Sequence, residues 1–383
     1  MADKILVRIT TVPLSLDKLL HGQLKFMRRF YKVIGISSEP EYLKRVGKRE
    51  GVEVHCVEMT RQITPLKDLV SVWNLYNYFR KIKPQIVHSH TPKAGIVAML
   101  AAKLAGVPNR LHTVAGLPLL EATGTKRKIL NVVEKATYGF ATKVYPNSFG
   151  LYNIILENKF CDKSKLKVLG NGSSNGIDTT HFSRENFSRE QIDSLKSGLG
   201  ISADDFTFVF VGRLVADKGL NELVAAFSNL STQNPRLKLL LVGDYETELD
   251  PLSADTLQII NTNNKIISTG FQPDVRPYLA ISNALAFPSY REGFPNVVMQ
   301  AASMDLPCIV SDINGCNEII REGENGLIIK VKDILTLEQA MHRVSTDENL
   351  YLSLQKQARL SITSRFEQQL LWQAVLDEYG SLD

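Results

Sequence analysis

Short apolar runs rich in β-branched residues alternate with amphipathic stretches along the first half of the chain. The amphipathic stretches, such as residues 66–82 and 127–141, repeat their apolar positions with the period of a helix. Alternation of strand and helix is typical of βαβ units with a mostly parallel sheet. The strands that we expect here cover residues 4–10, 31–37, 52–59, 85–90, 110–116, 143–147 and 165–171.

The alternation stops at residues 171–205, which are polar and rich in Ser, Gly and Asn. This composition predicts a linker with one short helix. The alternation then resumes, and the chain ends in an amphipathic stretch over residues 365–382. The strands that we expect in this second half cover residues 206–214, 237–245, 266–270, 284–289, 308–312 and 326–331.

These patterns predict an α/β protein built from two Rossmann-like domains, and 383 residues suffice for two cores. The first domain is expected over residues 1–178 and the second over 179–364. The helix at about 365–383 is expected to pack back on the first domain. Parallel sheets bind ligands at the carboxyl ends of their strands, so two domains facing each other would line one cleft with those ends.

The charge distribution differs sharply between the two halves. Residues 1–178 contain 28 Lys and Arg against 13 Asp and Glu, whereas residues 179–383 contain 17 against 27. The basic first half predicts an anionic partner, for which nucleic acid, a diphosphate-bearing acceptor and an anionic membrane surface all qualify from charge alone. A merely solvated basic face is the alternative.

The cysteines form no C-x-x-C pair and no zinc spacing, and nothing in their arrangement requires an oxidising compartment. We expect reduced, buried thiols at Cys56 and Cys308, which lie in strand-like runs. The four cysteines are Cys56, Cys161, Cys308 and Cys316.

The apolar segments are not typical of leaders or membrane spans. Lys4 and Arg8 interrupt the first apolar run, which is therefore a poor signal peptide. The longest apolar stretch, residues 95–107, contains Lys103 and is too short to cross a bilayer. We therefore expect a cytoplasmic protein, either free or peripheral at the inner face of the cell membrane.

The first segment with candidate chemistry is FVGRLVADKGL, residues 210–220. Gly212 and Arg213 end an apolar strand, and Lys218 precedes a helix. Two cations around a strand-to-helix turn suit a diphosphate, because Arg binds phosphate oxygens bidentately and the helix start adds amide donors. An ordinary surface loop is the alternative.

The second segment is YREGFPNVVMQA, residues 290–301, which also lies between a strand and a helix. Gly293 allows a ligand to approach the backbone closely. Glu292 can accept hydrogen bonds from sugar hydroxyls, and the amides of Phe294 and later residues can meet phosphate. The alternative is a capped turn with a solvated Glu292.

Together these segments resemble the donor half of the family-4 retaining glycosyltransferases of the GT-B fold, in the pattern G-R-x4-K-G followed by E-G-F. The resemblance implies that Arg213 and Lys218 hold the donor diphosphate and that Glu292 contacts the donor sugar. It implies a ribose contact at Gln300, where the family usually has a second acid, and a nucleobase contact near Phe271. The implied donor-binding set is Gly212, Arg213, Lys218, Phe271, Glu292, Gly293, Phe294, Pro295, Asn296 and Gln300.

The first half resembles the bacterial capsule and O-antigen branch of this family, through VHSHTPKAGIVAML, RLHTVAGLPLLEATG and GNGSSNGID. Many relatives place a His directly before the Gly that corresponds to Gly116, where this chain has Ala115. The nearest candidate catalytic residue is His112, for which a buried position in the core is the alternative. His90 and His88 end a strand, and we expect no metal site there, because no third ligand is evident.

Cations and leucines interleave over residues 16–32, which favours a basic amphipathic helix. Such a helix either binds anionic lipid headgroups or packs its leucines into the core and leaves its cations solvated.

The resemblance implies a retaining enzyme that moves a hexose or N-acetylhexosamine from a nucleotide diphosphate sugar, UDP-linked in our expectation, to a lipid-linked diphosphate or saccharide acceptor. We expect no metal, no other cofactor and no nucleic-acid partner. A GT-B-like UDP-sugar epimerase and a catalytically weak nucleotide or polyanion binder remain alternatives. A nicotinamide-dependent oxidoreductase is disfavoured, because no G-x-G-x-x-G follows a strand.

Overall fold

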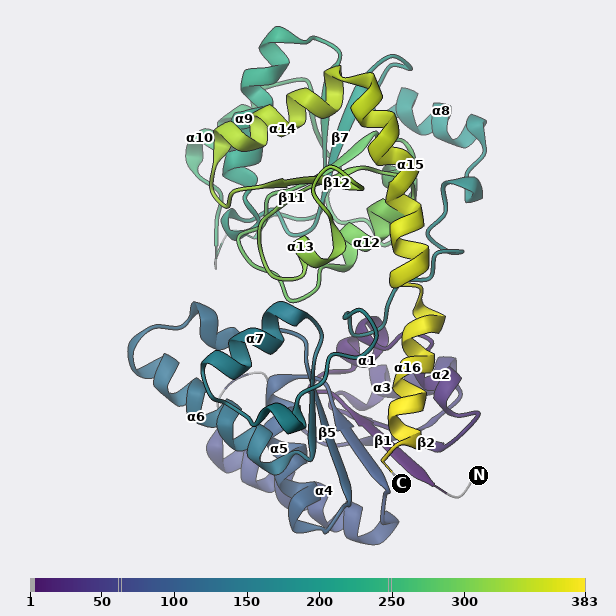
Figure 1. Ribbon diagram of the computed structural model, residues 1–383, viewed down its shortest axis with the longest axis vertical. Coiled ribbons are helices and arrows are strands. Elements are labelled where there is room, and N and C mark those ends of the chain that lie inside the picture. The colour runs from purple at the N-terminus through teal and green to yellow at the C-terminus, as the bar shows by residue number, and fades with distance from the viewer. Residues whose placement is uncertain (1–3, 61, 63, 247, 249, 383) are drawn as a thin grey trace. The chain divides into compact units, whose positions relative to one another are not determined.

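A computed structural model describes residues 4–60, 62, 64–246, 248 and 250–382. The chain divides into two units (Figure 1). Unit 1 comprises residues 1–176 with 369–383, and unit 2 comprises residues 177–368. The sequence predicts these divisions at residues 178 and 364. The last helix belongs to unit 1, because its apolar side chains Leu371, Val375 and Tyr379 join that unit's core.

Unit 1 contains a six-stranded parallel sheet in the order β3-β2-β1-β4-β5-β6. Six of the seven predicted strands are confirmed. Residues 165–171 form no strand, since Leu166 makes only an isolated bridge to Val144 and Gly170 turns the chain at a φ of 56°. The strands are β1 Ile5–Ile9, β2 Lys32–Ser37, β3 Glu53–Cys56, β4 Ile86–Ser89, β5 Asn109–Val114 and β6 Lys143–Pro146.

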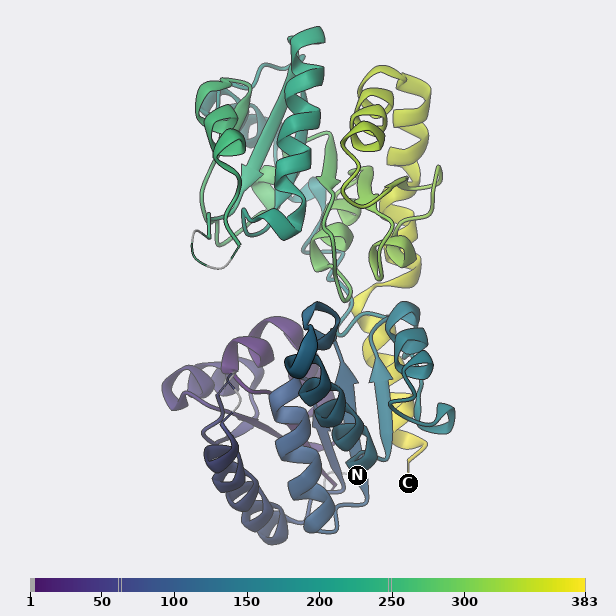
Figure 2. The same cartoon turned by 90° about the vertical axis from the view of Figure 1, so that its left-hand side faces the viewer.

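Helices cover both faces of this sheet, as Figure 2 shows. One core layer lies beneath α1 Pro13–Leu19, α2 Gln23–Met27, α3 Pro40–Glu50 and α16 Gln368–Gly380. The other lies beneath α4 Pro65–Ile82, α5 Pro92–Leu104, α6 Gly124–Phe140 and α7 Phe149–Glu157. Short 3-10 turns complete the unit, η1 at Pro118–Glu121 and η2 at Lys163–Lys165.

The single amphipathic helix predicted over residues 16–32 is wrong. The segment is two short helices, α1 and α2, separated at Gly22, whose φ is 77°. Leu16, Leu20 and Leu24 are fully buried. The leucines therefore face the core, which favours the second of the two alternatives for this segment.

Unit 2 contains a second six-stranded parallel sheet, in the order β12-β11-β10-β7-β8-β9. All six predicted strands are confirmed. The two longest end earlier than expected, because Gly212 and Gly243 turn the chain at φ values of 151° and 148°. The strands are β7 Phe206–Val211, β8 Leu237–Val242, β9 Ile266–Ser268, β10 Ala284–Phe287, β11 Cys308–Ser311 and β12 Gly326–Ile329.

The helices of unit 2 pack on the two faces of this sheet (Figures 1 and 2). The helix predicted within the polar segment 171–205 is α8, and a capping box between Ser188 and Gln191 starts it. The helical elements are η3 Arg184–Asn186, α8 Arg189–Gly198, η4 Ala216–Lys218, α9 Leu220–Gln233, α10 Ala254–Thr262, α11 Arg276–Ala280, α12 Asn296–Ser303, α13 Cys316–Ile319, α14 Ile334–Thr346 and α15 Glu348–Arg365.

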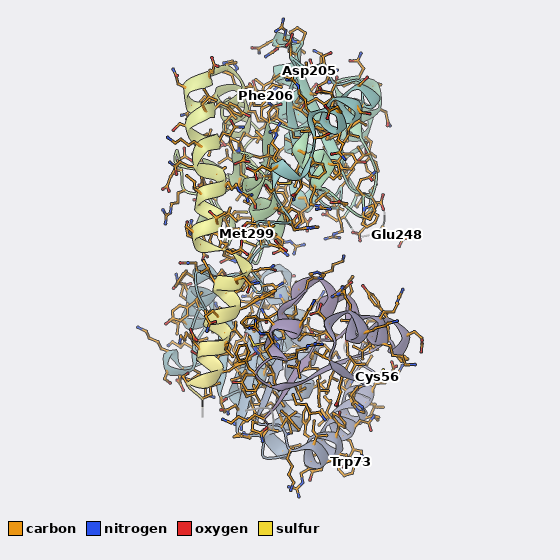
Figure 3. The ribbon with its side chains drawn as sticks, turned by 90° about the vertical axis from the view of Figure 1, so that its right-hand side faces the viewer. Cys56, Trp73, Asp205, Phe206, Glu248 and Met299 are labelled. Atoms are coloured by element: carbon orange, nitrogen blue, oxygen red, sulfur yellow. The ribbon has the colours of Figure 1, made fainter. Side chains whose placement is uncertain are left out.

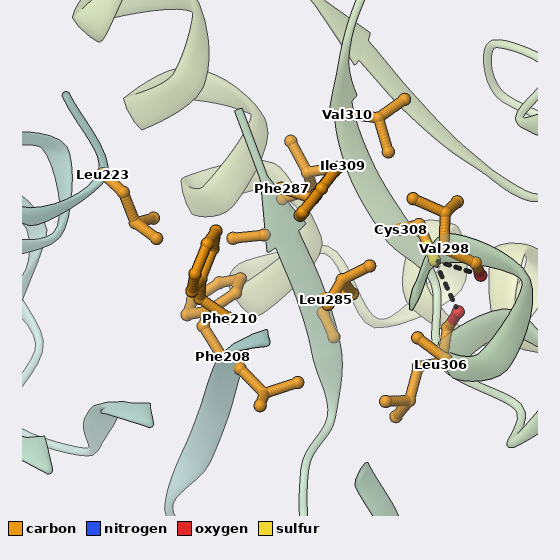
Figure 4. Close-up of a cluster of buried hydrophobic side chains, with 14 of the residues drawn as sticks. Phe208, Phe210, Leu223, Leu285, Phe287, Val298, Leu306, Cys308, Ile309 and Val310 are labelled. Carbon is orange, nitrogen blue, oxygen red and sulfur yellow. Dashed lines mark hydrogen bonds between the residues drawn. The ribbon is translucent and has the colours of Figure 1, made fainter. Parts of the chain in front are cut away.

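The core of unit 2 is built from aromatic and aliphatic side chains of the central strands (Figure 4). Phe210 and Phe287, from the neighbouring strands β7 and β10, stack with ring centroids 5.8 Å apart. Cys308 is a buried free thiol, and its burial raises the pKa. Cys56 is also free but only half-buried, because β3 is an edge strand.

Candidate functional site

The two candidate segments of unit 2 meet at the carboxyl edge of its sheet. Strands β7 and β10 are direct neighbours, so the loops that follow them lie side by side. Lys218 Nζ lies 2.6 Å from Glu292 Oε1, although 74 residues separate the two in the chain. Both side chains are about four-fifths buried, with exposed fractions of 18% and 16%. A partly desolvated pair of this kind is a strong local dipole that a charged ligand can reach.

Backbone contacts fix the distance between the two loops. The amide of Tyr290 donates to the carbonyl of Asp217 at 2.9 Å. Gly219 adopts a φ of 72°, and a Cβ at this position would lie 2.1 Å from the carbonyl oxygen of Pro288. Only glycine allows this approach. The K-G dipeptide at 218–219 is therefore a structural requirement of the pairing between Lys218 and Glu292.

Glu292 is oriented by further hydrogen bonds. The Ser289 hydroxyl donates to Glu292 Oε1 at 2.9 Å. The Asn314 side-chain amide donates to the carbonyls of Glu292 and Gly293 at 3.0 and 2.8 Å. The backbone and the carboxylate of Glu292 are thus both held in place, as a residue that positions a ligand requires.

Arg213 is held by a different acid. It forms an ion pair with Glu246, which follows β8, and its side chain remains 57% exposed. The two cations expected to share one diphosphate are therefore each paired with a separate carboxylate. A bound diphosphate would compete with Glu246 for Arg213 and with Glu292 for Lys218.

A cavity of about 460 Å³ opens beside Arg213 at the ends of β7, β8 and β9. Phe271 lines it with a side chain that is 69% exposed, and the Phe271 amide donates to Asp244 Oδ1 at 2.8 Å. An exposed aromatic ring beside a cavity offers a stacking surface for a planar ligand. The remaining lining includes Gly212, Gly243, Tyr245, Glu246 and Gln272.

The rest of the predicted donor-binding set lies at the start of α12. Asn296 is exposed at the first helical position, and Gln300 is half-buried one turn later. The Phe294 side chain is buried against Phe366, so only its backbone is available to a ligand. Pro295 occupies the N-cap and, lacking an N–H group, cannot serve as a phosphate donor.

The histidines of unit 1 are placed differently. His112 is 2% exposed, its Nδ1 lies 2.8 Å from Ser89 Oγ, and its ring fills the space beside Gly95. Burial lowers the pKa of His112 to about 4, so its ring is neutral near pH 7. The structure therefore favours the core position for His112 over the catalytic role, because a sealed ring meets no ligand.

His88 and His90 are also buried, at the edge of a cavity of only about 20 Å³. Arg8 Nε donates to His90 Nε2 at 2.9 Å, and Tyr379 Oη lies 2.6 Å from His88 Nδ1. Burial, with the nearby Arg8 charge, lowers the pKa of both rings. A cavity of this size holds roughly one water molecule, so these histidines belong to the packing of α16 on the sheet. In the described part of the chain, no three His, Cys, Asp or Glu side chains are grouped to hold a metal ion.

The acids that surround the two cations were not predicted as site residues. Glu246 pairs with Arg213, and Asp217 forms an ion pair with Arg291. Burial raises the pKa of Asp217, and Asp250 and Glu292 add to this shift while Lys218 opposes it. A signal was available in the position of Glu246, which directly follows the strand predicted over residues 237–245, because ligands bind at strand ends.

Solved structures share the whole architecture. A crystal structure of Anabaena HepE in complex with UDP and glucose superimposes with a TM-score of 0.82 at 19% sequence identity, covering 99% of this chain and 100% of that one. WaaG, a glycosyltransferase involved in lipopolysaccharide biosynthesis, superimposes with a TM-score of 0.72 at 14% identity, covering 96% and 98%. Two Rossmann-like units with this topology define the GT-B class of proteins.

Sequence comparison gives the family. The family described as glycosyl transferases group 1 matches residues 191–361, and that described as glycosyl transferase 4-like matches residues 20–148. The capsular polysaccharide biosynthesis glycosyltransferase CapM of Staphylococcus aureus is 30% identical over 382 residues, covering 100% of this chain and 98% of the relative. The UDP-Gal:alpha-D-GlcNAc-diphosphoundecaprenol alpha-1,3-galactosyltransferase of Escherichia coli is 32% identical over 314 residues, covering 80% and 78%.

The chain therefore belongs to the group 1 family of glycosyltransferases, family 4 of the GT-B fold, and is similar to a member named for capsular polysaccharide biosynthesis. It is a glycosyltransferase. None of the helices among the described residues combines the length and the apolar character needed to cross a bilayer.

Proposed function

We propose that this glycosyltransferase moves a hexose or N-acetylhexosamine, with retention of anomeric configuration, from a UDP-sugar to a lipid-linked diphosphate sugar. The observation that carries the proposal is the pairing of Lys218 with Glu292 beside a cavity that contains Arg213 and Phe271. These groups match the chemical parts of a nucleotide sugar: cations for the diphosphate, a carboxylate for the sugar hydroxyls and an aromatic ring for the base.

Donor binding would replace the two ion pairs of the site with contacts to the donor. The diphosphate binds Arg213 and Lys218 in place of the carboxylates of Glu246 and Glu292. Glu292, still oriented by Ser289, then accepts hydrogen bonds from the sugar hydroxyls. The exposed Phe271 ring stacks on the base, and Gln300 hydrogen-bonds the ribose hydroxyls as donor and acceptor.

Transfer breaks the bond between the anomeric carbon and the diphosphate oxygen, and negative charge develops on the leaving diphosphate. Arg213 and Lys218 would stabilise that charge from positions that exist before the reaction, an effect worth several kcal/mol in typical enzymes. The acceptor hydroxyl attacks from the face that the diphosphate leaves, and its proton passes to a leaving phosphate oxygen. This route balances charge without any further base from the protein.

The acceptor part of the proposal draws on the relatives. The Escherichia coli enzyme is named for transfer to a sugar on diphosphoundecaprenol. A Campylobacter jejuni relative, 24% identical over 333 residues, is named as an N,N'-diacetylbacillosaminyl-diphospho-undecaprenol alpha-1,3-N-acetylgalactosaminyltransferase. The basic first half of this chain is suited to an acceptor that carries a diphosphate.

The test is transfer of radiolabel from a panel of UDP-hexoses and UDP-N-acetylhexosamines to a synthetic polyprenyl diphosphate sugar, with the free sugar as a parallel acceptor. We expect label in the lipid product with α configuration when the donor is an α-linked UDP-sugar. Transfer only to the free sugar would overturn the lipid-linked acceptor. Conversion of the donor sugar in the absence of any acceptor would instead identify an epimerase.

A further inference from the structure

Helix α4 of unit 1 carries an apolar stripe that faces away from the core. Leu66, Leu69, Val70 and Trp73 are 80%, 62%, 60% and 62% exposed. They lie at positions i, i+3, i+4 and i+7, which share one face of a helix. The opposite face of the same helix is buried through residues such as Leu75, which is fully buried. Helix α4 therefore has two apolar faces, of which one packs in the core of unit 1 and the other is exposed to solvent.

The stripe continues across the neighbouring helices. Helices α4, α5 and α6 pack side by side on one face of the sheet. Leu104 at the end of α5 is 60% exposed and lines a shallow groove of about 430 Å³ with Leu69 and Trp73. On α6, Ile129 and Val132 are 46% and 66% exposed. Figure 3 shows Trp73 at the outer surface of the molecule.

The same three helices are strongly basic. They contain nine Lys and Arg, which are Lys67, Arg80, Lys81, Lys93, Lys103, Lys126, Arg127, Lys128 and Lys135, against two acids. Of these acids, Asp68 is paired with Lys93, and Glu134 is buried with a pKa that burial raises to about 7. Lys93 is neutralised by that pair, and the outer surface presents apolar side chains among exposed cations such as Lys67, Lys126 and Lys128.

We infer that the outer surface of α4, α5 and α6 docks on an anionic phospholipid bilayer, with Leu69, Val70 and Trp73 inserted between the headgroups. A face that combines apolar insertion with cations is the physical signature of interfacial binding. Tryptophan suits the boundary between headgroups and acyl chains, because its ring is apolar and its N–H is polar. A second copy of the chain is a poorer fit, since pairing this face with itself would bring the cations together.

This inference locates the membrane surface on the opposite side of the sheet from residues 16–32, where the leucines are buried. It rests on the proposed function in one respect only: membrane docking would bring the enzyme to the proposed lipid-linked acceptor. Binding to vesicles needs neither donor nor acceptor, so the two proposals fail separately. Transfer to a free sugar measures the catalytic site without the membrane.

The experiment is co-sedimentation of the full chain with phosphatidylcholine vesicles, with and without phosphatidylglycerol. We expect binding that rises with the phosphatidylglycerol fraction and falls with added salt. The double variant Leu69→Gln with Trp73→Gln should lower the partition coefficient at least about tenfold. Its matched control is Leu335→Gln with Leu360→Gln, which changes side chains of similar exposure, 62% and 55%, on helices of unit 2. The control should bind as the wild type does.

Charge-reversal variants show which of the two faces of unit 1 binds the membrane. Lys126→Glu with Lys128→Glu, on α6, should weaken binding about tenfold or more, because each basic residue near an anionic surface contributes several-fold. Lys18→Glu with Arg29→Glu, exposed on the opposite face, should change it little. The reverse outcome would return the membrane surface to residues 16–32 and overturn the inference.

Tryptophan fluorescence gives an independent measurement. The chain has two tryptophans, and Trp372 is only 6% exposed. A blue shift of emission on adding anionic vesicles would therefore report Trp73, and it should vanish in Trp73→Phe while sedimentation persists. Light scattering without lipid should give a monomer. A dimer that the paired Gln variant dissociates, together with no vesicle binding, would assign the stripe to a second copy and overturn the inference.

Discussion

The carboxyl edges of the two sheets differ, although both units have the same parallel topology. In unit 2 the edge carries two ion pairs, the largely buried Lys218 with Glu292 and the more exposed Arg213 with Glu246, beside a cavity of about 460 Å³. In unit 1 the edge carries Arg8 and the buried His88 and His90 around a cavity of about 20 Å³. A shared fold thus carries a candidate ligand site in one unit and a packed polar core in the other.

The difference arises from what covers each edge. Within unit 1, α16 places Tyr379 against Arg8 and His88, at 3.0 and 2.6 Å, and so closes the polar groups off from solvent. In unit 2, glycines at 212, 219 and 243 keep the loops close to one another without side chains that would fill the space. Polar residues at strand ends therefore indicate a site only when nothing in the same unit packs over them.

The largest expected effect concerns Arg213 and Lys218 of unit 2, which we propose bind the donor diphosphate. Lys218→Ala and Arg213→Ala should each lower kcat/KM at least about tenfold, because each removes positive charge that opposes the charge growing on the leaving group. Steady-state rates with a UDP-sugar measure this. The control is Lys356→Ala, an exposed lysine on α15, which should leave the rate unchanged. Wild-type rates in the Arg213 and Lys218 double variant would show that this edge is not the donor site.

Glu292→Gln tests whether the carboxylate acts in turnover or in folding. We expect a lower kcat with little change in Tm, since the amide keeps the Ser289 contact and the size of the side chain but loses the charge. Parallel measurements of kcat and of thermal unfolding check this. Normal activity per folded molecule combined with a large drop in Tm would make Glu292 a structural cap. The polar residues of both units would then serve folding alone.

His112→Ala tests the same comparison in unit 1, where we expect the polar residues to act in folding rather than in catalysis. We expect a loss of stability of about 1–3 kcal/mol, as for other buried polar groups whose partner is removed, with kcat unchanged per folded molecule. Chemical denaturation and kinetics together measure the two effects. A large loss of kcat in a fully stable variant would return His112 to the active site.

The pKa of His112 also predicts how stability depends on pH. Its value is lowered from 6.5 to about 4 by burial, so the unfolded chain binds more protons between these values. Stability is therefore fully present above about pH 6.5 and should fall as the pH falls toward 4. His112→Asn should make this pH dependence shallower, as measured by Tm at several pH values. An equally steep dependence would assign the effect to His88 and His90, whose pKa values are also lowered.

The smallest effect is expected at Gln300. If its amide contacts the ribose, Gln300→Glu should be tolerated and should tighten UDP binding by a factor of about five or less, through a charge-assisted hydrogen bond. Calorimetric titration with UDP measures it, with Gln300→Ala as the weakened counterpart. Identical affinities in all three proteins would place Gln300 outside the nucleotide site.

The sequence by itself determined the elements and their order. Twelve of thirteen predicted strands are present, and the linker helix lies where polar composition placed it. The motif segments also predicted which loops of unit 2 form the candidate site, and these loops do meet in the structure, because apolar periodicity and glycine positions are local properties of the chain. The burial of the Phe294 side chain could not be judged in this way, since it depends on how α12 packs, whereas the missing N–H of Pro295 is evident from the sequence.

Only the tertiary structure decided which groups meet and which faces are covered. The pairing of Lys218 with Glu292 joins residues 74 positions apart, and the partner of Arg213 comes from a third loop. Periodicity marks the apolar faces of residues 16–32 and of α4 equally well. The leucines of the first segment are buried while Leu69 and Trp73 remain exposed, because burial depends on which elements pack over a face, and that depends on the whole sheet rather than on the segment.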